Sequence, residues 1–410
     1  MGMRILAFAY ACEPDKGSEP AAGWLWVRML ARMAEVWVVT RANNREAIEA
    51  RLEQLPERSQ LHFVYIDLPP WARFWKRGGR GVRVYYLLWQ LAALRKARSL
   101  NVMMEFDVIW HLTLANAWLG SVGGWVGPRF VFGPVGGGVG IPWRLVPSLG
   151  AKGIIYEVGR SLARISCRHL NPLARAAYGR ADLILVQNRE TRAWLPVSCQ
   201  SRVRIFPNIA VEEMPEAGVL PRAGFRPPAA LYAGRLLPLK GVAYAIEAVA
   251  ALPEWRLIVY GSGPDAARLH RIATRRGTRN RVDFRGWCPR TEILRAMKEE
   301  ADVFLFPSLH DEAGFAVIDA LACGLPVVCV DRGGPPVLAG ESALPVPATG
   351  LWPRAFAMKV ADALRLARTG KSVAGSRCRA NEFLLEARAE QLRVLLEDVP
   401  TLRPATRTAA

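Results

Sequence analysis

Residues 304–328 read FLFPSLHDEAGFAVIDALACGLPVV, and this stretch decides the fold. An apolar run of strand length comes first, a polar loop follows it, and the next apolar residues recur with the period of a helix. Gly324 and Pro326 then lead into a second apolar run. A strand, a helix and a further strand in this order form the repeating unit of a parallel sheet covered by helices. The stretch therefore predicts an α/β domain.

Two carboxylates flank the start of this predicted helix. Asp311 stands just before it and Asp319 stands within it, eight residues further along. At 1.5 Å per helical residue they are about 12 Å apart, which roughly matches a sugar diphosphate from hexose to ribose. The first N–H groups of the helix are unpaired and lie at the positive end of its dipole, so a diphosphate would be stabilised there. The alternative interpretation is an ordinary strand–helix unit with two surface acids.

Strand-like runs recur along the chain, with room for a helix between consecutive runs. They fall into two groups, which predict two separate parallel sheets. The first group comprises residues 4–12, 35–40, 62–68, 107–113, 130–133, 182–187 and 203–207, and the second comprises residues 229–234, 256–261, 282–286, 302–307, 326–330 and 343–346.

The two groups are separated by a segment rich in Pro and Gly, which has the composition of a linker. We therefore predict a Rossmann-like domain over residues 1–210, a linker over 211–228, a second Rossmann-like domain over 229–400 and a frayed tail over 401–410. The final helix of the second domain could pack back on the first. Ligands of open parallel sheets bind beyond the carboxyl ends of the strands, so two such sheets facing one another would enclose a cleft.

The chain is strongly basic. Its 410 residues hold 55 Lys and Arg against 36 Asp and Glu, a net charge of +19, and residues 1–210 carry 28 of the basic and 14 of the acidic residues. Such a surface attracts the phosphates of a soluble substrate, of an anionic lipid or of a nucleic acid, and charge alone does not choose among them. The seven cysteines are scattered without a Cys-x-x-Cys pair, which favours reduced thiols in a cytoplasmic protein.

Residues 108–128 carry no formal charge and are long enough to cross a bilayer. Gly and Pro interrupt this run, so a strand followed by a buried helix and a Gly-rich loop explains it better. The short apolar run after Arg4 faintly resembles a signal peptide, but charged residues follow it at once. We therefore expect a buried strand at the start of each run.

Loops that follow predicted strands carry small or cationic residues. Gly17 lies after the first strand, where small residues let the backbone approach a ligand. Arg235 and Lys240 follow the first strand of the second domain, and together they could neutralise a diphosphate without a metal ion. Solvated surface cations are the alternative.

Two tight turns end later strands on the same predicted rim. One contains Gly261, and the other contains Trp287 and Cys288. Both turns are candidates for contact with a nucleotide base or ribose. Ordinary connections between a strand and a helix are the alternative.

With the first loop, the Arg and Lys turn, the Gly turns and the spaced acids in this order, the chain resembles glycosyltransferase family 4. Members of that family are retaining sugar-nucleotide enzymes of the GT-B fold, in which two Rossmann-like domains face each other across a cleft. The resemblance covers nearly the whole chain. It implies that Arg235 and Lys240 hold the donor diphosphate, that Asp319 binds the ribose hydroxyls and that Asp311 lies beside the transferred sugar. The family motif has glutamates at both acid positions, and Glu312 is an alternative to Asp311.

The resemblance also implies contacts made by glycines and by residues at the start of the helix. These are Gly17, Gly314, Phe315 and Ala316 on the donor side, and Gly136, Gly137 and Gly138 on the acceptor side. His111 ends the fourth predicted strand, where many members of the family place a polar residue near the anomeric carbon. A buried structural histidine is the alternative there.

The implied activity is transfer of a hexose, with retention of configuration, from a nucleotide sugar to a glycan or lipid-linked acceptor. The chain has no Asp-x-Asp motif, so we expect neither a metal requirement nor another cofactor. Two alternative functions stay open. The first is a sugar-nucleotide epimerase or phosphorylase on the same fold, and the second is a basic nucleic-acid-binding protein. No recognition helix or RNA-binding motif is recognisable, so we do not expect a nucleic-acid partner.

Residues 71–98 hold eight basic residues, six aromatic residues and no acid, and residues 151–180 add six basic residues against Glu157 alone. The first segment could rest on an anionic membrane, with cations at the head groups and rings below them. This interpretation predicts a cytoplasmic enzyme attached to the inner face of the cytoplasmic membrane. The alternative is a pair of amphipathic helices packed on the first domain with a solvated basic face.

Overall fold

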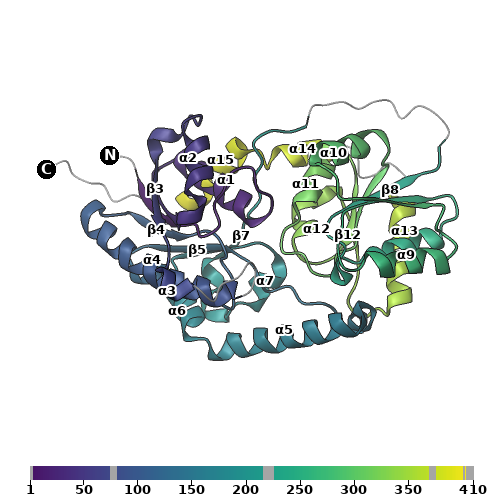
Figure 1. Ribbon diagram of the computed structural model, residues 1–410, viewed down its shortest axis with the longest axis horizontal. Coiled ribbons are helices and arrows are strands. Elements are labelled where there is room, and N and C mark those ends of the chain that lie inside the picture. The colour runs from purple at the N-terminus through teal and green to yellow at the C-terminus, as the bar shows by residue number, and fades with distance from the viewer. Residues whose placement is uncertain (1–2, 74–80, 216–225, 369–374, 400–401, 403–410) are drawn as a thin grey trace.

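Two parallel sheets, each covered by helices, lie side by side in the computed structural model (Figure 1). The model describes residues 3–73, 81–215, 226–368, 375–399 and 402. All strand pairs in both sheets are parallel. The two doubly wound domains predicted from the strand pattern are therefore confirmed.

The first sheet has seven strands in the order β3-β2-β1-β4-β5-β6-β7. They are β1 (Arg4–Phe8), β2 (Glu35–Arg41), β3 (Leu61–Ile66), β4 (Val108–His111), β5 (Phe130–Val135), β6 (Leu183–Val186) and β7 (Val203–Ile205). The central strands are buried along their length because helices cover both faces. The strand order reverses between β1 and β4, and such a switch point opens a crevice beyond the carboxyl ends of the two strands.

The second sheet has six strands in the order β10-β9-β8-β11-β12-β13. They are β8 (Ala229–Ala233), β9 (Arg256–Tyr260), β10 (Val282–Gly286), β11 (Val303–Phe306), β12 (Val327–Val330) and β13 (Ala343–Val346). Its switch point lies between β8 and β11. Strand β11, helix α11 (Phe315–Ala322) and strand β12 are the strand, helix and strand read from residues 304–328.

Helices surround both sheets. In the first domain they are α1 (Glu19–Ala31), α2 (Arg45–Leu52), α3 (Pro70–Arg73), α4 (Val82–Met104), α5 (Gly150–Leu170), α6 (Pro172–Arg180) and α7 (Arg189–Trp194). In the second part of the chain they are α8 (Val242–Ala250), α9 (Ala266–Arg275), α10 (Arg290–Glu299), α11, α12 (Gly334–Ala339), α13 (Pro353–Ala367), α14 (Ser376–Asn381) and α15 (Leu385–Glu397). The 3₁₀ turns are η1 (Ala42–Asn44), η2 (Arg58–Gln60), η3 (Gly123–Trp125), η4 (Trp143–Leu149), η5 (Val197–Arg202), η6 (Pro238–Lys240) and η7 (Gly340–Ser342).

The basic aromatic segment at 71–98 forms α3 and most of α4, and its residues 74–80 lie outside the described part of the chain. In α4, Tyr85, Tyr86 and Trp89 are buried against the first sheet, so these three rings do not reach the surface. Arg95, Lys96 and Arg98 of the same helix are exposed, which is consistent with an amphipathic helix packed on the domain. No described helix combines the length and the hydropathy needed to cross a bilayer.

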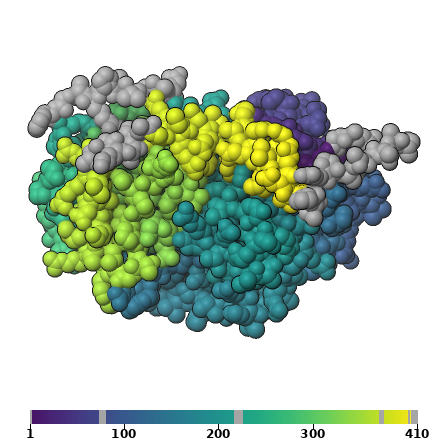
Figure 2. Space-filling view, turned by 180° about the vertical axis from the view of Figure 1, so that it is seen from behind, coloured from purple at the N-terminus to yellow at the C-terminus, as the bar shows by residue number. Residues whose placement is uncertain are grey.

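The C-terminal segment crosses from the second domain to the first (Figure 2). Helix α14 packs against α11, and the chain then pairs with the linker through the Val211 N–H to Phe383 O bond and the Leu385 N–H to Val211 O bond, both 2.9 Å. Helix α15 packs on α1 and buries Leu385 and Leu392 in the first domain's core. The predicted domain bounds stay predictions, and the predicted tail lies outside the described residues except for Leu402.

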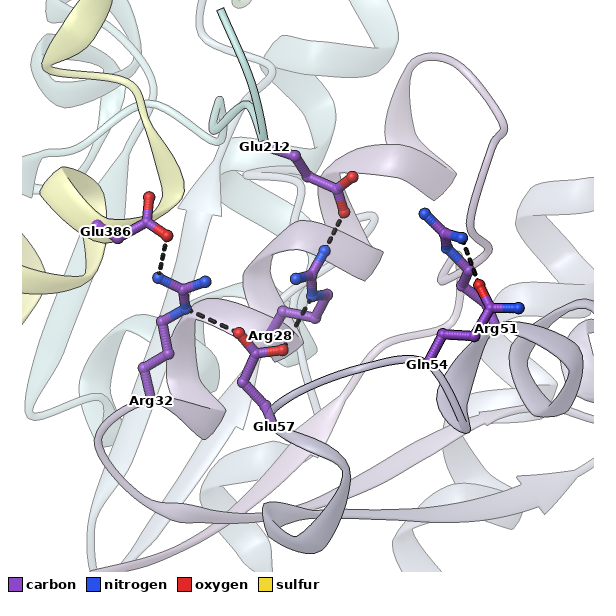
Figure 3. Close-up of polar contacts among 7 residues, drawn as sticks. All are labelled: Arg28, Arg32, Arg51, Gln54, Glu57, Glu212 and Glu386. Atoms are coloured by element: carbon purple, nitrogen blue, oxygen red, sulfur yellow. Dashed lines mark hydrogen bonds and ion pairs between the residues drawn. The ribbon is translucent and has the colours of Figure 1, made fainter.

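A group of ion pairs ties the linker and α15 to α1 (Figure 3). Glu57 accepts hydrogen bonds from Arg28 Nε at 3.3 Å and from Arg32 Nε at 2.9 Å. Arg28 also pairs with Glu212 in the linker, and Arg32 pairs with Glu386 at the start of α15. Because Arg28 and Glu57 are buried, each charge depends on its partners to offset the loss of water.

Removal of Glu57 leaves two guanidinium groups without their shared partner. We expect Glu57→Ala to lower the free energy of unfolding by about 3 kcal/mol. This value is at the lower end of the range for a broken buried ion pair, because Glu212 and Glu386 still pair with the two arginines. Thermal unfolding followed by circular dichroism measures the change. The exposed pair of Arg51 and Gln54 in Figure 3 supplies the control, and Gln54→Ala should shift stability by less than about 0.5 kcal/mol. Equal effects of both variants would contradict the prediction.

Candidate active site

A cavity of about 1320 Å³ lies between the two domains, where the switch points of both sheets meet. From the first domain, residues that follow β1, β4 and β5 line it, among them Ser18, Leu114 and Gly136. From the second domain, residues that follow β8 and β11 line it, among them Arg235 and Asp311. The cavity therefore occupies the place where open parallel sheets bind their ligands.

The two cations predicted to bind a diphosphate both line this cavity. Arg235 is exposed, and no described acid lies within ion-pair distance of it, so its charge is free for a ligand. Lys240 Nζ lies 2.5 Å from Asp311 Oδ2, and both side chains are largely buried. One predicted acid and one predicted cation are thus paired with each other.

The start of helix α11 also faces the cavity. Gly314, Phe315 and Ala316 all line it, and no side chain caps the first N–H groups of this helix. Gly314 has a φ of 114°, a conformation that favours glycine, and it turns the loop from β11 into the helix. The predicted anion-binding helix start therefore opens into the same space as Arg235 and Lys240.

The two neighbouring acids point to different partners. Asp311 faces Lys240 in its own domain, whereas Glu312 reaches across the cleft to the first domain. Its Oε2 accepts from Asn188 Nδ2 at 2.9 Å and from Thr191 Oγ1 at 3.3 Å. Burial raises the pKa of Glu312, while the bond from Asn188 acts in the opposite direction. Glu312 therefore links the domains across the cavity, and Asp311 lies beside the predicted phosphate cations.

Five predicted donor-binding residues do not line the cavity in this structure, namely Gly17, Gly261, Trp287, Cys288 and Asp319. Asp319 on α11 forms a bidentate pair with Arg290, with Oδ1 2.6 Å from Arg290 Nη2. Trp287 is 74% exposed and Cys288 is half-buried, and both precede α10. Gly261 lies behind the wall, where an added Cβ would stand 1.9 Å from Gly234 O. Glycine at 261 is therefore required by the close approach of two loops.

Two of the three predicted acceptor-side glycines line the cavity and one does not. Gly136 and Gly137 line the cavity. Gly138 instead packs under α7, where an added Cβ would meet Thr191 Cα at 2.3 Å. Gly17 is exposed and outside the cavity, while its neighbours Ser18 and Glu19 line it.

His111 is buried behind the cavity wall. Its Nε2 lies 2.6 Å from the hydroxyl of Tyr86, and its Nδ1 lies 2.6 Å from Ser121 Oγ. Tyr86 lines the cavity, whereas His111 does not. Burial lowers the pKa of His111 to about 4, so the ring is neutral near pH 7. In this structure, Tyr86 connects His111 to the cavity.

The sequence interpretation missed Glu19, a carboxylate in the cavity wall. Its Oε1 accepts from the Leu114 N–H at 2.7 Å, and burial raises its pKa. Ser18 and Leu114 both have positive φ, 63° and 51°, which is rare for residues other than glycine. Backbone strain of this kind concentrates at functional sites. A Ser-Glu pair directly after the first predicted strand was the available signal.

The sequence interpretation also missed the inner face of α5. Arg160 donates to His310 Nε2 at 2.6 Å and pairs with Glu157, and both Arg160 and His310 line the cavity. Arg164 donates to Gly138 O. Glu157, Arg160 and Arg164 are three and four residues apart, a spacing that places them on one face of a helix.

Residues 224–368 match the family model for Glycosyl transferases group 1. Over these residues the chain is similar to the group 1 glycosyl transferases. Among curated proteins, the lipopolysaccharide core biosynthesis glycosyltransferase LpsE of Rhizobium meliloti is 36% identical over 108 residues, which are 26% of this chain and 31% of LpsE. The 2-deoxystreptamine glucosyltransferase of Streptomyces kanamyceticus is 33% identical over 128 residues, 30% of this chain and 32% of that enzyme. The matches thus span about a third of these relatives.

The arrangement of both domains is similar to that of a solved structure of comparable length. The crystal structure of HepE from Anabaena in complex with UDP and glucose superposes with a TM-score of 0.57 at 16% identity, and the match covers 96% of this chain and 99% of HepE. Likeness at this level of identity concerns the fold. The predicted GT-B arrangement, with the group 1 match in its second half, is confirmed.

His310 provides a pH test of the cavity wall. Burial lowers its pKa to about 3, and the charges of Arg160 and Lys240 act in the same direction. The unfolded chain binds a proton near pH 6.5 and the folded chain does not, so His310 lowers stability as pH falls below about 6.5. At pH 5 this contribution is about 1–2 kcal/mol. We expect His310→Gln to show a smaller loss of melting temperature between about pH 7 and pH 5 than the unmodified protein.

The exposed His169 on α5 supplies the matched control, and His169→Gln should keep the pH slope of the unmodified protein. The slopes of melting temperature against pH are compared between the three proteins. In each of them the raised pKa values of Glu19 and Glu312 increase stability as the pH falls, which opposes the effect of His310. Identical slopes in all three proteins would contradict the burial of a neutral His310.

Proposed function

We propose that the protein is a retaining glycosyltransferase that moves a hexose from a nucleoside diphosphate sugar to a glycan or lipid-linked acceptor. One observation carries the proposal. A free Arg235, Lys240 and the uncapped start of α11 converge from the second domain on a cavity whose other wall belongs to the first domain. The match to the group 1 family supports it.

The chemical barrier in glycosyl transfer lies in charge separation, because the anomeric carbon becomes positive and the departing diphosphate becomes negative. Arg235 and the α11 N–H groups would stabilise the negative charge, because they are positive groups already placed where it develops. Lys240 would exchange part of its contact with Asp311 for a phosphate oxygen. With these three positive groups we propose that no metal ion is needed.

Asp311 would then lie beside the transferred sugar, because its partner Lys240 is drawn toward the phosphate. In a retaining step, the bond from the anomeric carbon to the phosphate oxygen breaks and a bond to the acceptor oxygen forms on the same face. The acceptor hydroxyl gives its proton to the departing diphosphate. Glu312 would hold the two domains in register, and Glu19 and Gly137 would border the acceptor.

The donor and acceptor are proposed from chemistry and from relatives. HepE was solved with UDP and glucose, and LpsE acts in lipopolysaccharide core biosynthesis. We therefore propose a UDP-hexose or a related donor, and a bacterial envelope glycan or its lipid-linked precursor. A thermal-shift panel of nucleotide sugars tests the donor, because a ligand that binds the folded state raises the melting temperature. Release of nucleoside diphosphate only in the presence of an acceptor separates transfer from epimerisation.

Arg235→Ala and Lys240→Ala each remove one positive charge from the proposed phosphate site. We expect each to lower the rate of transfer by about ten- to a thousandfold, in the range for loss of one electrostatic contact in a transition state. Initial rates of nucleoside diphosphate release measure the effect. Lys359→Ala, on the exposed surface of α13, is the control and should leave the rate unchanged. Turnover near the normal rate in both site variants would refute the assignment.

A role of Asp319 in binding the donor ribose can be distinguished by experiment from a structural ion pair with Arg290. If Asp319 binds ribose, the ribose hydroxyls replace Arg290 when the donor arrives. We then expect Asp319→Asn to raise the KM for the donor by about tenfold or more, because a hydrogen bond to a charged group is lost. Arg290→Ala should leave the KM for the donor unchanged or lower it. A purely structural ion pair would instead make both variants less stable and change donor KM in neither.

We further propose that the protein works in the cytoplasm at the inner face of the cytoplasmic membrane. Helix α4 supports this through its outward side chains, where Arg95, Lys96 and Arg98 follow Val84 and Leu91, all exposed. The helix carries no acid. An acceptor held in a membrane would be reached most readily by an enzyme attached to the same surface.

A further inference from the structure

Helix α5 carries apolar side chains on its outer face. Ile155, Val158, Leu162 and Ile165 are spaced by three, four and three residues, so they form one stripe along the helix. Their side chains are 73%, 50%, 61% and 55% exposed. The stripe is about 15 Å long at 1.5 Å per residue. Figure 1 shows α5 along the lower edge of the molecule, with this long helix extending from beneath the first domain toward the second.

The inner face of the same helix is charged. Glu157 is 4% exposed and is held by Arg160, whose remaining N–H groups reach Val139 O and His310. Arg164 donates to Gly138 O beside the cavity. A surface helix of a globular protein ordinarily buries its apolar stripe and exposes its charges. Helix α5 does the reverse, so its outer stripe lacks a covering element among the described residues.

The surroundings of the stripe are positive. Between residues 108 and 181 the chain contains one acid, Glu157, and that acid is turned inward. Lys152 and Arg168 on α5 and Arg175 on α6 are exposed. An apolar stripe flanked by cations matches the boundary between lipid head groups and acyl chains of an anionic leaflet.

We infer that the outer face of α5 docks on an anionic membrane, with Ile155, Val158, Leu162 and Ile165 in contact with lipid and the cations at the head groups. Charge selects this occupant over a second copy of the chain, because two such faces would bring like charges together. The inference rests on the proposed attachment to a membrane and adds α5 to α4 as a surface that contacts it.

Docking through α5 has a consequence for the cavity. Lys152, Tyr156 and Arg160 on the same helix line it. A helix is about 10 Å thick, so only this thickness would separate the bilayer from the site. A lipid-linked acceptor could then enter from the membrane without leaving it. The arrangement also connects lipid contact with the Arg160–His310 bond that joins the domains.

The test is cosedimentation of the full chain with vesicles of phosphatidylcholine in which a quarter of the lipid is phosphatidylglycerol, compared with pure phosphatidylcholine vesicles. We expect stronger binding to the anionic vesicles, and weaker binding as salt is raised. The double variant Ile155→Gln, Leu162→Gln should bind at least about tenfold more weakly, because two side chains no longer transfer to lipid. Neither residue lines the cavity, and both are exposed in the folded chain.

Val394→Gln provides the matched control, since Val394 is an exposed valine on α15, away from α5. It should bind the vesicles as the unmodified protein does. Circular dichroism and the melting temperature of each variant show whether it is folded. Equal binding by the double variant would overturn the assignment of α5, and so would absence of binding to either vesicle.

Light scattering of the protein without lipid tests the competing occupant. A dimer that the double variant abolishes would show that α5 meets a second copy, and would overturn the inference. Failure of the inference is distinguishable from failure of the proposed transferase. A nucleotide sugar that raises the melting temperature of the double variant as much as that of the unmodified protein leaves the donor site intact whatever the vesicles show.

Discussion

The parallel arrangement of both sheets is the constraint on which the site depends. In a parallel sheet, all loops that follow a strand leave at one edge, and the two switch points concentrate them further. In this chain the edges of two sheets face one another, so residues as distant in sequence as Glu19 and Asp311 line one cavity. A change that rotated either sheet would separate the cations from the opposite wall.

The relative position of the sheets is set by polar contacts together with an apolar contact, in which Leu145 and Leu149 of η4 are buried in the core of the second domain. Glu312 bonds Asn188, and the Gly333 N–H donates to Glu190 at 3.0 Å. The linker and α15 add the ion pairs around Arg28 and Arg32. Polar contacts of this kind exchange readily with water, so they suit two domains that must admit and release a ligand.

Helix α5 serves the cavity on one face and presents an apolar stripe on the other. One helix thus combines a polar face toward the cavity with an apolar face toward the outside. Arg160 and Arg164 donate to backbone carbonyls and to His310 at the cleft, while the outer apolar residues stay half or more exposed in the folded chain. A stripe retained at the cost of exposed hydrophobic area is the kind of surface that marks an interaction site.

The sequence by itself determined the fold and the positions of the candidate ligand-binding residues along the chain. The period of the apolar residues identified every strand of both sheets, and the deciding stretch at 304–328 gave β11, α11 and β12, because buried parallel strands and their helices leave strong local patterns. It also placed Arg235, Lys240, Asp311 and Gly314 at the ends of strands, where ligands bind.

Only the tertiary structure decided which side chains face the cavity. It paired Asp319 with Arg290, placed His111 behind Tyr86 and turned the charges of α5 inward. These outcomes depend on partners far away in sequence and on the rotation of each helix against its neighbours, and local periodicity carries no information about either.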